Sequence, residues 1–93
     1  MIKSFADPDT ERLFRRERVR RYPAELLRAM LRKLALDDAA EQLDDPRVPP
    51  GNRLEKLRGD RAGQHGIRIN DRWRICFRWQ DGDAFAVQIV DYD

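Results

Sequence analysis

The amino-acid sequence predicts an α+β domain, in which an N-terminal strand and a helical hairpin pack on a small antiparallel sheet. Up to about residue 43, apolar residues recur at the three- and four-residue spacing of amphipathic helices. From residue 53 onward they alternate with polar residues, as in strands that bury one face. The chain has 93 residues and neither half is large enough to fold alone, so we expect residues 1–93 to form a single domain.

The first elements begin close to the N-terminus. Apolar and polar residues alternate over residues 2–5, which predicts a short strand. Asp7 can cap the free N–H groups of a helix, and Pro8 suits its first position because the N–H that it lacks has no partner there. The residue before a proline disfavours helical geometry, so Pro23 predicts that this helix ends near residues 20–22.

A second helix is expected from Pro23 to about Leu43. Its apolar stripe follows the spacing of one helix face and consists of Leu27, Met30, Leu31 and Leu34. Residues 44–52 contain three prolines and a glycine, so we expect no helix there. Two consecutive helices with a short joint predict a helical hairpin.

Strands are expected over the rest of the chain. Residues 53–57 form a short one, residues 59–63 a loop, and residues 65–70 the next strand. From residue 73 to residue 79 the odd-numbered side chains are apolar and share one face. The opposite face carries Arg72, Arg74, Cys76 and Arg78.

The register of the last hairpin follows from its faces. A two-residue loop at Asp81-Gly82 would pair residues whose numbers sum to 163, which opposes apolar to polar side chains. A sum of 164 pairs Trp79 with Phe85, Phe77 with Val87 and Ile75 with Ile89, and keeps the apolar face intact. We therefore predict a three-residue loop or a bulge. The same register places Tyr92 opposite Arg72 and diagonal to Arg74, on the solvent face of the sheet.

Basic residues are concentrated in two segments. Residues 12–33 contain nine against two acidic ones, and residues 53–78 contain eight against three, although the net charge is only +2. Only three of the 19 basic residues are lysines, and arginine presents a planar fork that suits phosphate and carboxylate. The asymmetry indicates a surface for nucleic acid or for an acidic protein segment. The alternative is a charged face that merely keeps a half-exposed sheet soluble.

Several function classes find no support in the sequence. The single Cys76 excludes an internal disulfide, and no spacing of His, Cys and carboxylates suggests a metal site or a cofactor. No apolar run approaches the roughly 20 residues of a membrane span, and the acidic N-terminal segment does not resemble a signal peptide, so we expect a cytoplasmic protein. His65, the only histidine, is expected to have a structural role rather than a catalytic one.

The order of elements, with a basic open face on the sheet, resembles the RelE/ParE superfamily of bacterial type II toxins. The resemblance is closer to its HigB-like branch, including GraT-like members, and rests on the stretches IKSF, PPGNRLEKLRGDRAGQHGIRIND, WRICFRW and VDYD. It implies a ribosome-dependent mRNA endonuclease that needs no metal and inhibits translation from the A site. The implied partners are a HigA-type antitoxin, mRNA and the 70S ribosome, with operator DNA reached only through the antitoxin and no membrane involved.

The resemblance assigns catalytic roles to four matching residues. Arg74 corresponds to an arginine thought to stabilise the transition state, and Arg58 occupies a position that is often basic in the family. Asp91 and Tyr92 correspond to an acidic residue and a tyrosine associated with activity. The other basic residues of this half are expected to bind RNA, namely Arg53, Lys56, Arg61, Arg68, Arg72 and Arg78.

Two positions depart from the family pattern. Glu55 stands where some HigB toxins have a catalytic histidine, although GraT-like members also carry glutamate there. Asp93 stands where the motif commonly ends in histidine. Both are candidates for proton transfer, which requires suitable pKa values.

Two further functions remain open at this stage. A toxin weakened or disarmed by Asp93 could serve as a co-repressor bound to its antitoxin. A ParE-like inhibitor of DNA gyrase is less favoured, because the Trp-Arg strand and the C-terminal Asp-Tyr resemble the RNase branch.

Overall fold

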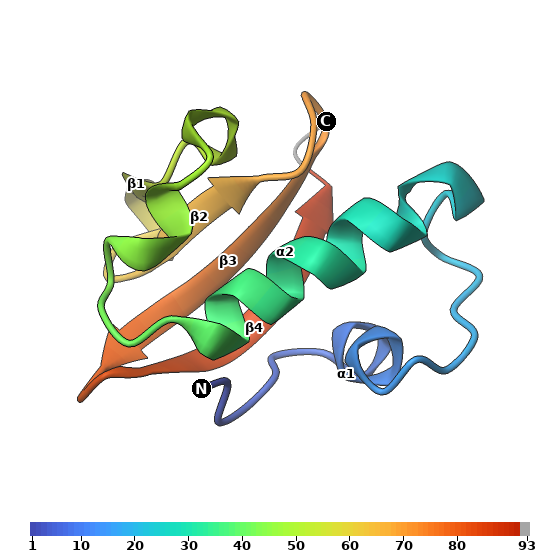
Figure 1. Cartoon of the computed structure of the whole chain (residues 1–93), viewed down its shortest axis with the longest axis horizontal. Helices are drawn as coiled ribbons and strands as arrows, with labels where there is room; N and C mark the ends of the chain where they lie inside the picture. The colour runs from blue at the N-terminus through green and yellow to red at the C-terminus, as the bar shows by residue number, and fades with distance from the viewer. Residues whose placement is uncertain (92–93) are drawn as a thin grey trace.

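The computed structural model describes residues 1–91, in which helices cover one face of a four-stranded antiparallel sheet (Figure 1). The strands lie in the order β1-β2-β3-β4, and each pairs with its neighbour in the chain. The elements are α1 (Pro8–Phe14), α2 (Leu27–Ala39), β1 (Glu55–Lys56), β2 (His65–Arg68), β3 (Trp73–Gln80) and β4 (Asp83–Asp91). The predicted α+β class, with helices packed on a small antiparallel sheet, is confirmed.

The N-terminal segment runs parallel to the outer edge of β4. It forms no regular strand, in contrast to the prediction for residues 2–5, and makes two isolated bridges, Ile2 to Ala84 and Phe5 to Val87. The backbone N–H of Lys3 donates to Ala84 O at 2.8 Å, and that of Val87 donates to Ser4 O at 3.1 Å. The segment therefore satisfies backbone groups that would otherwise leave this edge open to other strands.

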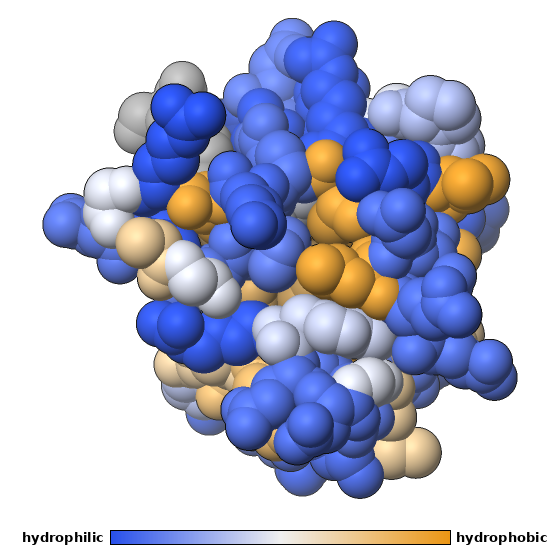
Figure 2. Space-filling view, turned by 90° about the vertical axis from the view of Figure 1, so that its left-hand side faces the viewer, coloured by the Kyte–Doolittle hydropathy of each residue, from blue (hydrophilic) through white to orange (hydrophobic). Residues whose placement is uncertain are grey.

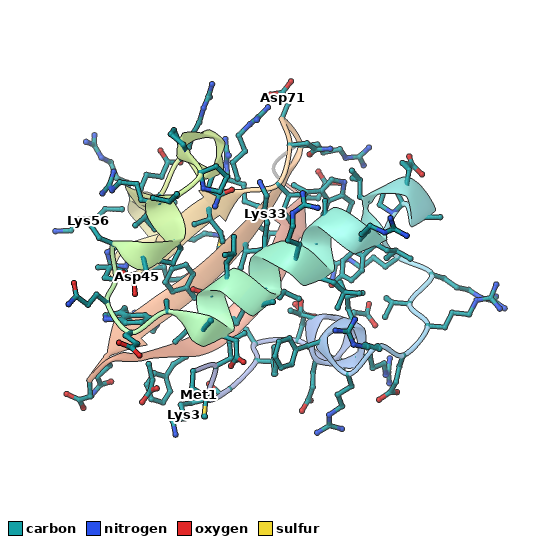
Figure 3. The ribbon with its side chains drawn as sticks, viewed as in Figure 1. Met1, Lys3, Lys33, Asp45, Lys56 and Asp71 are labelled. Carbon is teal, nitrogen blue, oxygen red and sulfur yellow. The ribbon has the colours of Figure 1, made fainter. Side chains whose placement is uncertain are left out.

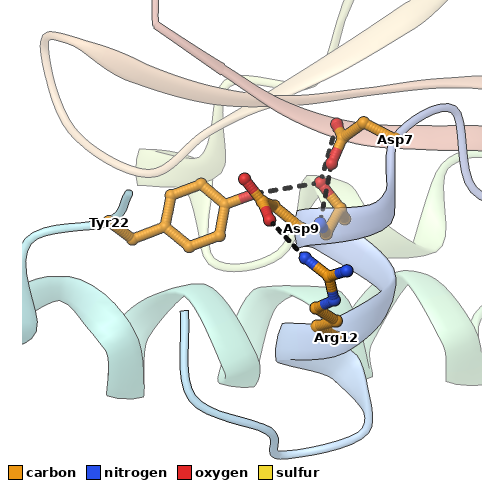
Figure 4. A network of polar contacts seen from close by, with 5 residues as sticks. Asp7, Asp9, Arg12 and Tyr22 are labelled. Atoms are coloured by element: carbon orange, nitrogen blue, oxygen red, sulfur yellow. Dashed lines mark hydrogen bonds and ion pairs between the residues drawn. The ribbon is translucent and has the colours of Figure 1, made fainter. Parts of the chain in front are cut away.

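A buried hydroxyl network ties α1 to the sheet (Figure 4). Asp7 caps the helix, because its Oδ1 accepts from the Thr10 backbone N–H at 2.7 Å. The Thr10 hydroxyl donates to Asp7 Oδ2 at 3.0 Å, accepts from the Ile89 N–H at 3.0 Å and lies 3.1 Å from the Tyr22 hydroxyl. Since Thr10 has only one proton to donate, the Tyr22 hydroxyl donates to it. Burial is the main cause of the raised pKa of Tyr22.

Helix α1 ends at Phe14, so the prediction that it reaches residues 20–22 was wrong. Arg16 adopts a left-handed conformation with φ 64°. The N–H of Arg16 donates to Leu13 O at 2.8 Å and that of Glu17 donates to Arg12 O at 2.9 Å, which together form a Schellman motif. Residues 15–18 are all charged and exposed, so a longer helix would have buried no apolar face there.

Helix α2 is shorter than predicted at both ends. A 3₁₀ turn, Ala24–Leu26, precedes it, and it stops at Ala39 rather than near Leu43. The carboxylate of Asp45 accepts from the N–H groups of Glu41 and Gln42 at 2.9 and 3.0 Å, which holds those amides outside the helix. Residues 44–52 contain no α-helix, as expected, but do form two 3₁₀ turns, Asp45–Arg47 and Pro50–Asn52.

The β3–β4 hairpin contains the bulge that its faces required. Ile75 lies opposite Ile89 as predicted, whereas Trp79 lies opposite Ala84 rather than Phe85. The pairing therefore slips by one residue between Cys76 and Arg78, next to Ala86 at φ 51°. The two-residue turn at Asp81-Gly82 is kept because the bulge restores the apolar face. The predicted pair Trp79–Phe85 was wrong for this reason, whereas Phe77 and Val87 lie within the bulge.

The core lies between the helices and the face of the sheet that bears Phe77. Fully buried side chains from α2, β2, β3 and β4 fill it, among them Met30, Leu34, Ile67, Ile75, Phe77, Val87 and Ile89. Tyr22 packs edge-on against Trp73, with ring centroids 5.6 Å apart. The packing leaves the opposite face of the sheet uncovered by helices (Figure 1).

Candidate active site

The register of the sheet groups the polar residues of its open face into two cross-strand rows. Arg68, Arg74 and Val90 form one row across β2, β3 and β4. Glu55, Gly66, Cys76 and Gln88 form the other row across all four strands. Opposed residues on neighbouring strands point to the same face, so the Arg74 row and the Glu55 row are adjacent on one surface.

Arg68 and Arg74 lie directly opposite each other on β2 and β3, in half-buried positions. Like charges directly opposite each other destabilise a sheet unless an anion lies between or beside them. Asp71 provides one carboxylate, since it forms an ion pair with Arg68 at the tip of the β2–β3 turn, where Figure 3 labels it. Its pKa is lowered mainly by that hydrogen bond and then by the charges of Arg68, Arg53 and Arg74.

Lys33 adds a further positive charge behind this cluster. Its Nζ donates to the Arg68 backbone carbonyl at 2.7 Å, which ties α2 to the end of β2 (Figure 3). The pKa of Lys33 is lowered, mainly by burial and then by the charges of Arg32 and Arg68. The buried Nε of Arg68 has no hydrogen-bond partner within residues 1–91. The cluster therefore combines three cationic side chains, Lys33, Arg68 and Arg74, with the single carboxylate of Asp71.

Glu55 lies on β1 at the exposed edge of the sheet. With Lys56, Leu57 and Arg58 it lines a shallow depression of about 730 Å³. Its Cα is about 12 Å from that of Arg74, given strands about 4.8 Å apart and a rise of about 3.4 Å per residue. Both side chains are long, so they can approach one phosphate group from two sides.

Asp91 stands apart from the Arg74 row. It pairs with Trp73 in the sheet, and its Oδ2 accepts from Arg72 Nε at 2.8 Å and lies 2.7 Å from Arg72 Nη2. The guanidinium of Arg72 also lies 5.7 Å from the Trp73 ring centroid. Arg72 therefore holds the end of β4 to the start of β3. Tyr92 and Asp93 lie outside the described residues, and so does the predicted pairing of Tyr92 with Arg72.

The other predicted RNA-binding residues lie around the two rows. Arg53 is exposed in a left-handed conformation with φ 48°, and Arg61 donates to Gln64 Oε1 at 3.3 Å. The guanidinium of Arg78 packs so closely on Gly63 that a Cβ there would lie 2.8 Å from its Nη1. Lys56 pairs with His65 and therefore belongs to the row of Phe77, which the structure does not bring together with Arg74.

His65 stacks on Phe77, with ring centroids 6.1 Å apart and planes at 28°. Its pKa is lowered, mainly by burial and then by Lys56, so the ring is neutral at pH 7. A residue that the sequence reasoning missed is Gln88, a half-buried polar side chain in the Glu55 row. Its place opposite Cys76 agrees with the predicted register, in which the numbers of paired residues sum to 164, so alternation of apolar residues in β4 could have found it.

The surface around β1 is mainly hydrophilic, with apolar patches of limited size between charged groups (Figure 2). Within residues 1–91, only Met1 and Val48 are large apolar residues that are classed as exposed. No group of three or more His, Cys, Asp or Glu residues in the described part of the chain could hold a metal ion. In the same residues no helix is sufficiently long and apolar to traverse a bilayer.

Comparison with known proteins identifies the family. The profile of the RelE-like toxins of type II toxin–antitoxin system HigB matches residues 3–93. The chain belongs to the HigB-like toxin family. It is 40% identical over 85 residues to "Toxin HigB-1" of Vibrio cholerae, covering 90% of each protein. It is also 30% identical over 92 residues to "Endoribonuclease HigB" of Proteus vulgaris, covering 99% of each.

The fold of this HigB-like toxin is also that of a solved structure. YafQ from Escherichia coli strain BL21(DE3) superposes with a TM-score of 0.56 at 9% sequence identity, covering 99% of this chain and 94% of YafQ. At that identity the likeness concerns the fold alone. As the toxin of a type II toxin–antitoxin system, the chain has an antitoxin as its partner.

Proposed function

We propose that this HigB-like toxin is a metal-independent endoribonuclease that cleaves mRNA on the 70S ribosome. The observation that carries the proposal is the half-buried pair Arg68 and Arg74, which shares the open face of the sheet with Glu55. Paired guanidiniums suit a phosphate group, and the relative from Proteus vulgaris is named an endoribonuclease. Neither α1 nor α2 packs on this face (Figure 1), which leaves room for an extended single strand.

The proposed reaction is an attack of a ribose 2′-oxygen on the adjacent phosphorus. The new bond joins the 2′-oxygen to phosphorus, and the bond to the 5′-oxygen of the next nucleotide breaks. Arg74 stabilises the extra negative charge of the transition state, and Arg68 holds the phosphate. Glu55 accepts the 2′-hydroxyl proton, and the C-terminal Tyr92 or Asp93 protonates the leaving 5′-oxygen. Asp91 and Arg58 support the site from the end of β4 and from the loop after β1.

The remaining proposed RNA contacts position the strand. Arg53, Lys56, Arg61, Arg72 and Arg78 contribute charge around the site, which raises affinity without reading sequence. The antitoxin silences the toxin, and operator DNA is reached only through that partner. We infer a cytoplasmic site of action because ribosomes are the proposed target.

The test is induction of the toxin in growing cells, followed by mapping of mRNA 5′ ends. New ends within translated codons, lost in Arg74→Ala and kept in Arg12→Ala, support the ribosome-dependent RNase. Arg12 is the matched control because it is exposed and lies on α1, in the helical layer. Cleavage seen only in Asp93→His would indicate a toxin disarmed at this position. The absence of cleavage in all variants, including Asp93→His, would refute the RNase.

A further inference from the structure

A groove on the outer side of α2 is lined by three arginines and two apolar residues. Its lining consists of Arg16, Arg28 and Arg32 with the apolar residues Leu31 and Ala35, and its volume is about 420 Å³. None of the three guanidiniums has an ion pair or a side-chain hydrogen bond within residues 1–91. By contrast, the neighbouring Arg12 and Arg15 pair with Asp9 and Glu11.

The backbone at Arg16 indicates that this side chain is not placed there for stability. Arg16 occupies the position after the helix end in the Schellman motif, at φ 64°. Glycine is the usual residue at that position, because a Cβ is strained in the left-handed region. A glycine would therefore stabilise the turn, yet the sequence retains an arginine that borders the groove.

The chemistry of the groove identifies the kind of occupant. Three positive charges and no acidic residue line the groove, so it is electrostatically complementary to an anionic group. A nucleic acid would satisfy the arginines but would leave the apolar lining residues Leu31 and Ala35 exposed to water. An amphipathic helix with apolar residues on one side and carboxylates beside them matches both features.

We propose that this groove is a docking site for an acidic amphipathic helix of a partner protein. Residues 28, 31, 32 and 35 are one helical face of α2, so they present a straight track along which a second helix can lie. The groove is on the helical layer, whereas Arg68 and Arg74 lie on the other face of the sheet. A partner can therefore occupy the groove while the open face stays accessible. The proposal does not depend on RNA cleavage.

The test is binding of a fluorescein-labelled synthetic peptide of about 14 residues, roughly four helical turns, with leucines on one face and glutamates beside them. Its affinity for the parent is measured by fluorescence anisotropy and compared with that for Arg28→Gln/Arg32→Gln. We expect the double variant to bind about tenfold more weakly, with a smaller dependence on salt. Arg47→Gln, which removes an exposed arginine that does not line the groove, is expected to retain the affinity of the parent.

Arg16→Gly separates docking from folding. It removes one guanidinium from the groove and relieves the strained backbone, so it should weaken peptide binding while the urea midpoint stays the same or rises. The proposal fails if the parent does not bind the peptide at up to about 1 mM. It also fails if a peptide of scrambled order binds as well, or if Arg47→Gln loses as much affinity as the groove variant. Weaker binding of an RNA 12-mer, but not of the peptide, in Arg28→Gln/Arg32→Gln would assign the groove to nucleic acid instead.

Discussion

The buried carboxyl of Asp37 makes the stability of this protein depend on pH. Asp37 lies on α2, is fully buried, and neither carboxyl oxygen has a hydrogen-bond partner within residues 1–91. Burial raises its pKa from 3.8 to about 7, opposed by the N-terminal ammonium group and assisted by Asp38. The folded protein therefore keeps a proton that the unfolded chain releases.

The sign and size of the effect follow from linkage. Because the folded-state pKa is the higher one, the contribution of Asp37 to stability is fully present below pH 3.8 and is lost as the pH rises to about 7. At about 1.4 kcal/mol per pH unit, the interval from 3.8 to about 7 amounts to about 4 kcal/mol. Asp37→Asn cannot ionise and should not show this loss.

The assay is urea unfolding of the parent and of Asp37→Asn at several pH values between 4 and 8, followed by tryptophan fluorescence. The free energy of unfolding of the variant, minus that of the parent, should rise by about 4 kcal/mol across this range. Comparing the two proteins cancels the titration of all other groups. Glu41→Gln, which removes an exposed carboxylate just beyond α2, is the control and should keep the pH dependence of the parent. A difference that does not change with pH would refute the reasoning.

Three further predictions concern the parts that hold the site in place. Thr10→Val should destabilise the protein by about 2–3 kcal/mol in urea unfolding, because it leaves buried polar partners unsatisfied; an effect as small as that of Thr10→Ser would contradict this. Gly63→Ala should lower the melting temperature, since φ is 90° and a Cβ would meet Arg78, whereas Gly51→Ala, with open space around it, should not. Arg72→Ala should cost less than about 1 kcal/mol in stability because its ion pair is largely exposed. It should nevertheless speed amide hydrogen exchange at the end of β4, and unchanged exchange there would argue against the anchoring role.

Much of the fold follows from local chemistry that can be seen in the sequence. The Asp7-Pro8 pair predicts the start of α1, because capping and the missing proline N–H act within one turn. Alternation of apolar residues predicts β3 and β4 and requires a three-residue loop or a bulge between them, because a slip of one residue would expose the core face; the structure has the bulge. The pairing of Ile75 with Ile89 follows from the same requirement.

The ends of the helices were less predictable because competing local hydrogen bonds decide them. Pro23 predicts an end of α1 near residues 20–22, but the helix already stops at Phe14, in a Schellman motif with a non-glycine residue that sequence rules do not favour. Beyond α2, the carboxylate of Asp45 accepts hydrogen bonds from the N–H groups of Glu41 and Gln42. In a longer helix these N–H groups would have donated to backbone carbonyls. In both places a competing hydrogen-bond pattern overrode helical periodicity.

The sequence alone determined the class of fold and the family resemblance. It also determined which polar side chains share one face of a strand, such as Arg74 and Cys76 on β3. The tertiary structure decided which of them meet. Strand pairing places Arg68 beside Arg74 and separates Asp91 from both, because side chains on a pleated sheet gather by register rather than by order in the chain. Packing likewise buried Asp37 and left Arg16 beside Arg28, since burial and proximity depend on surfaces that residues far apart in the chain form only after folding.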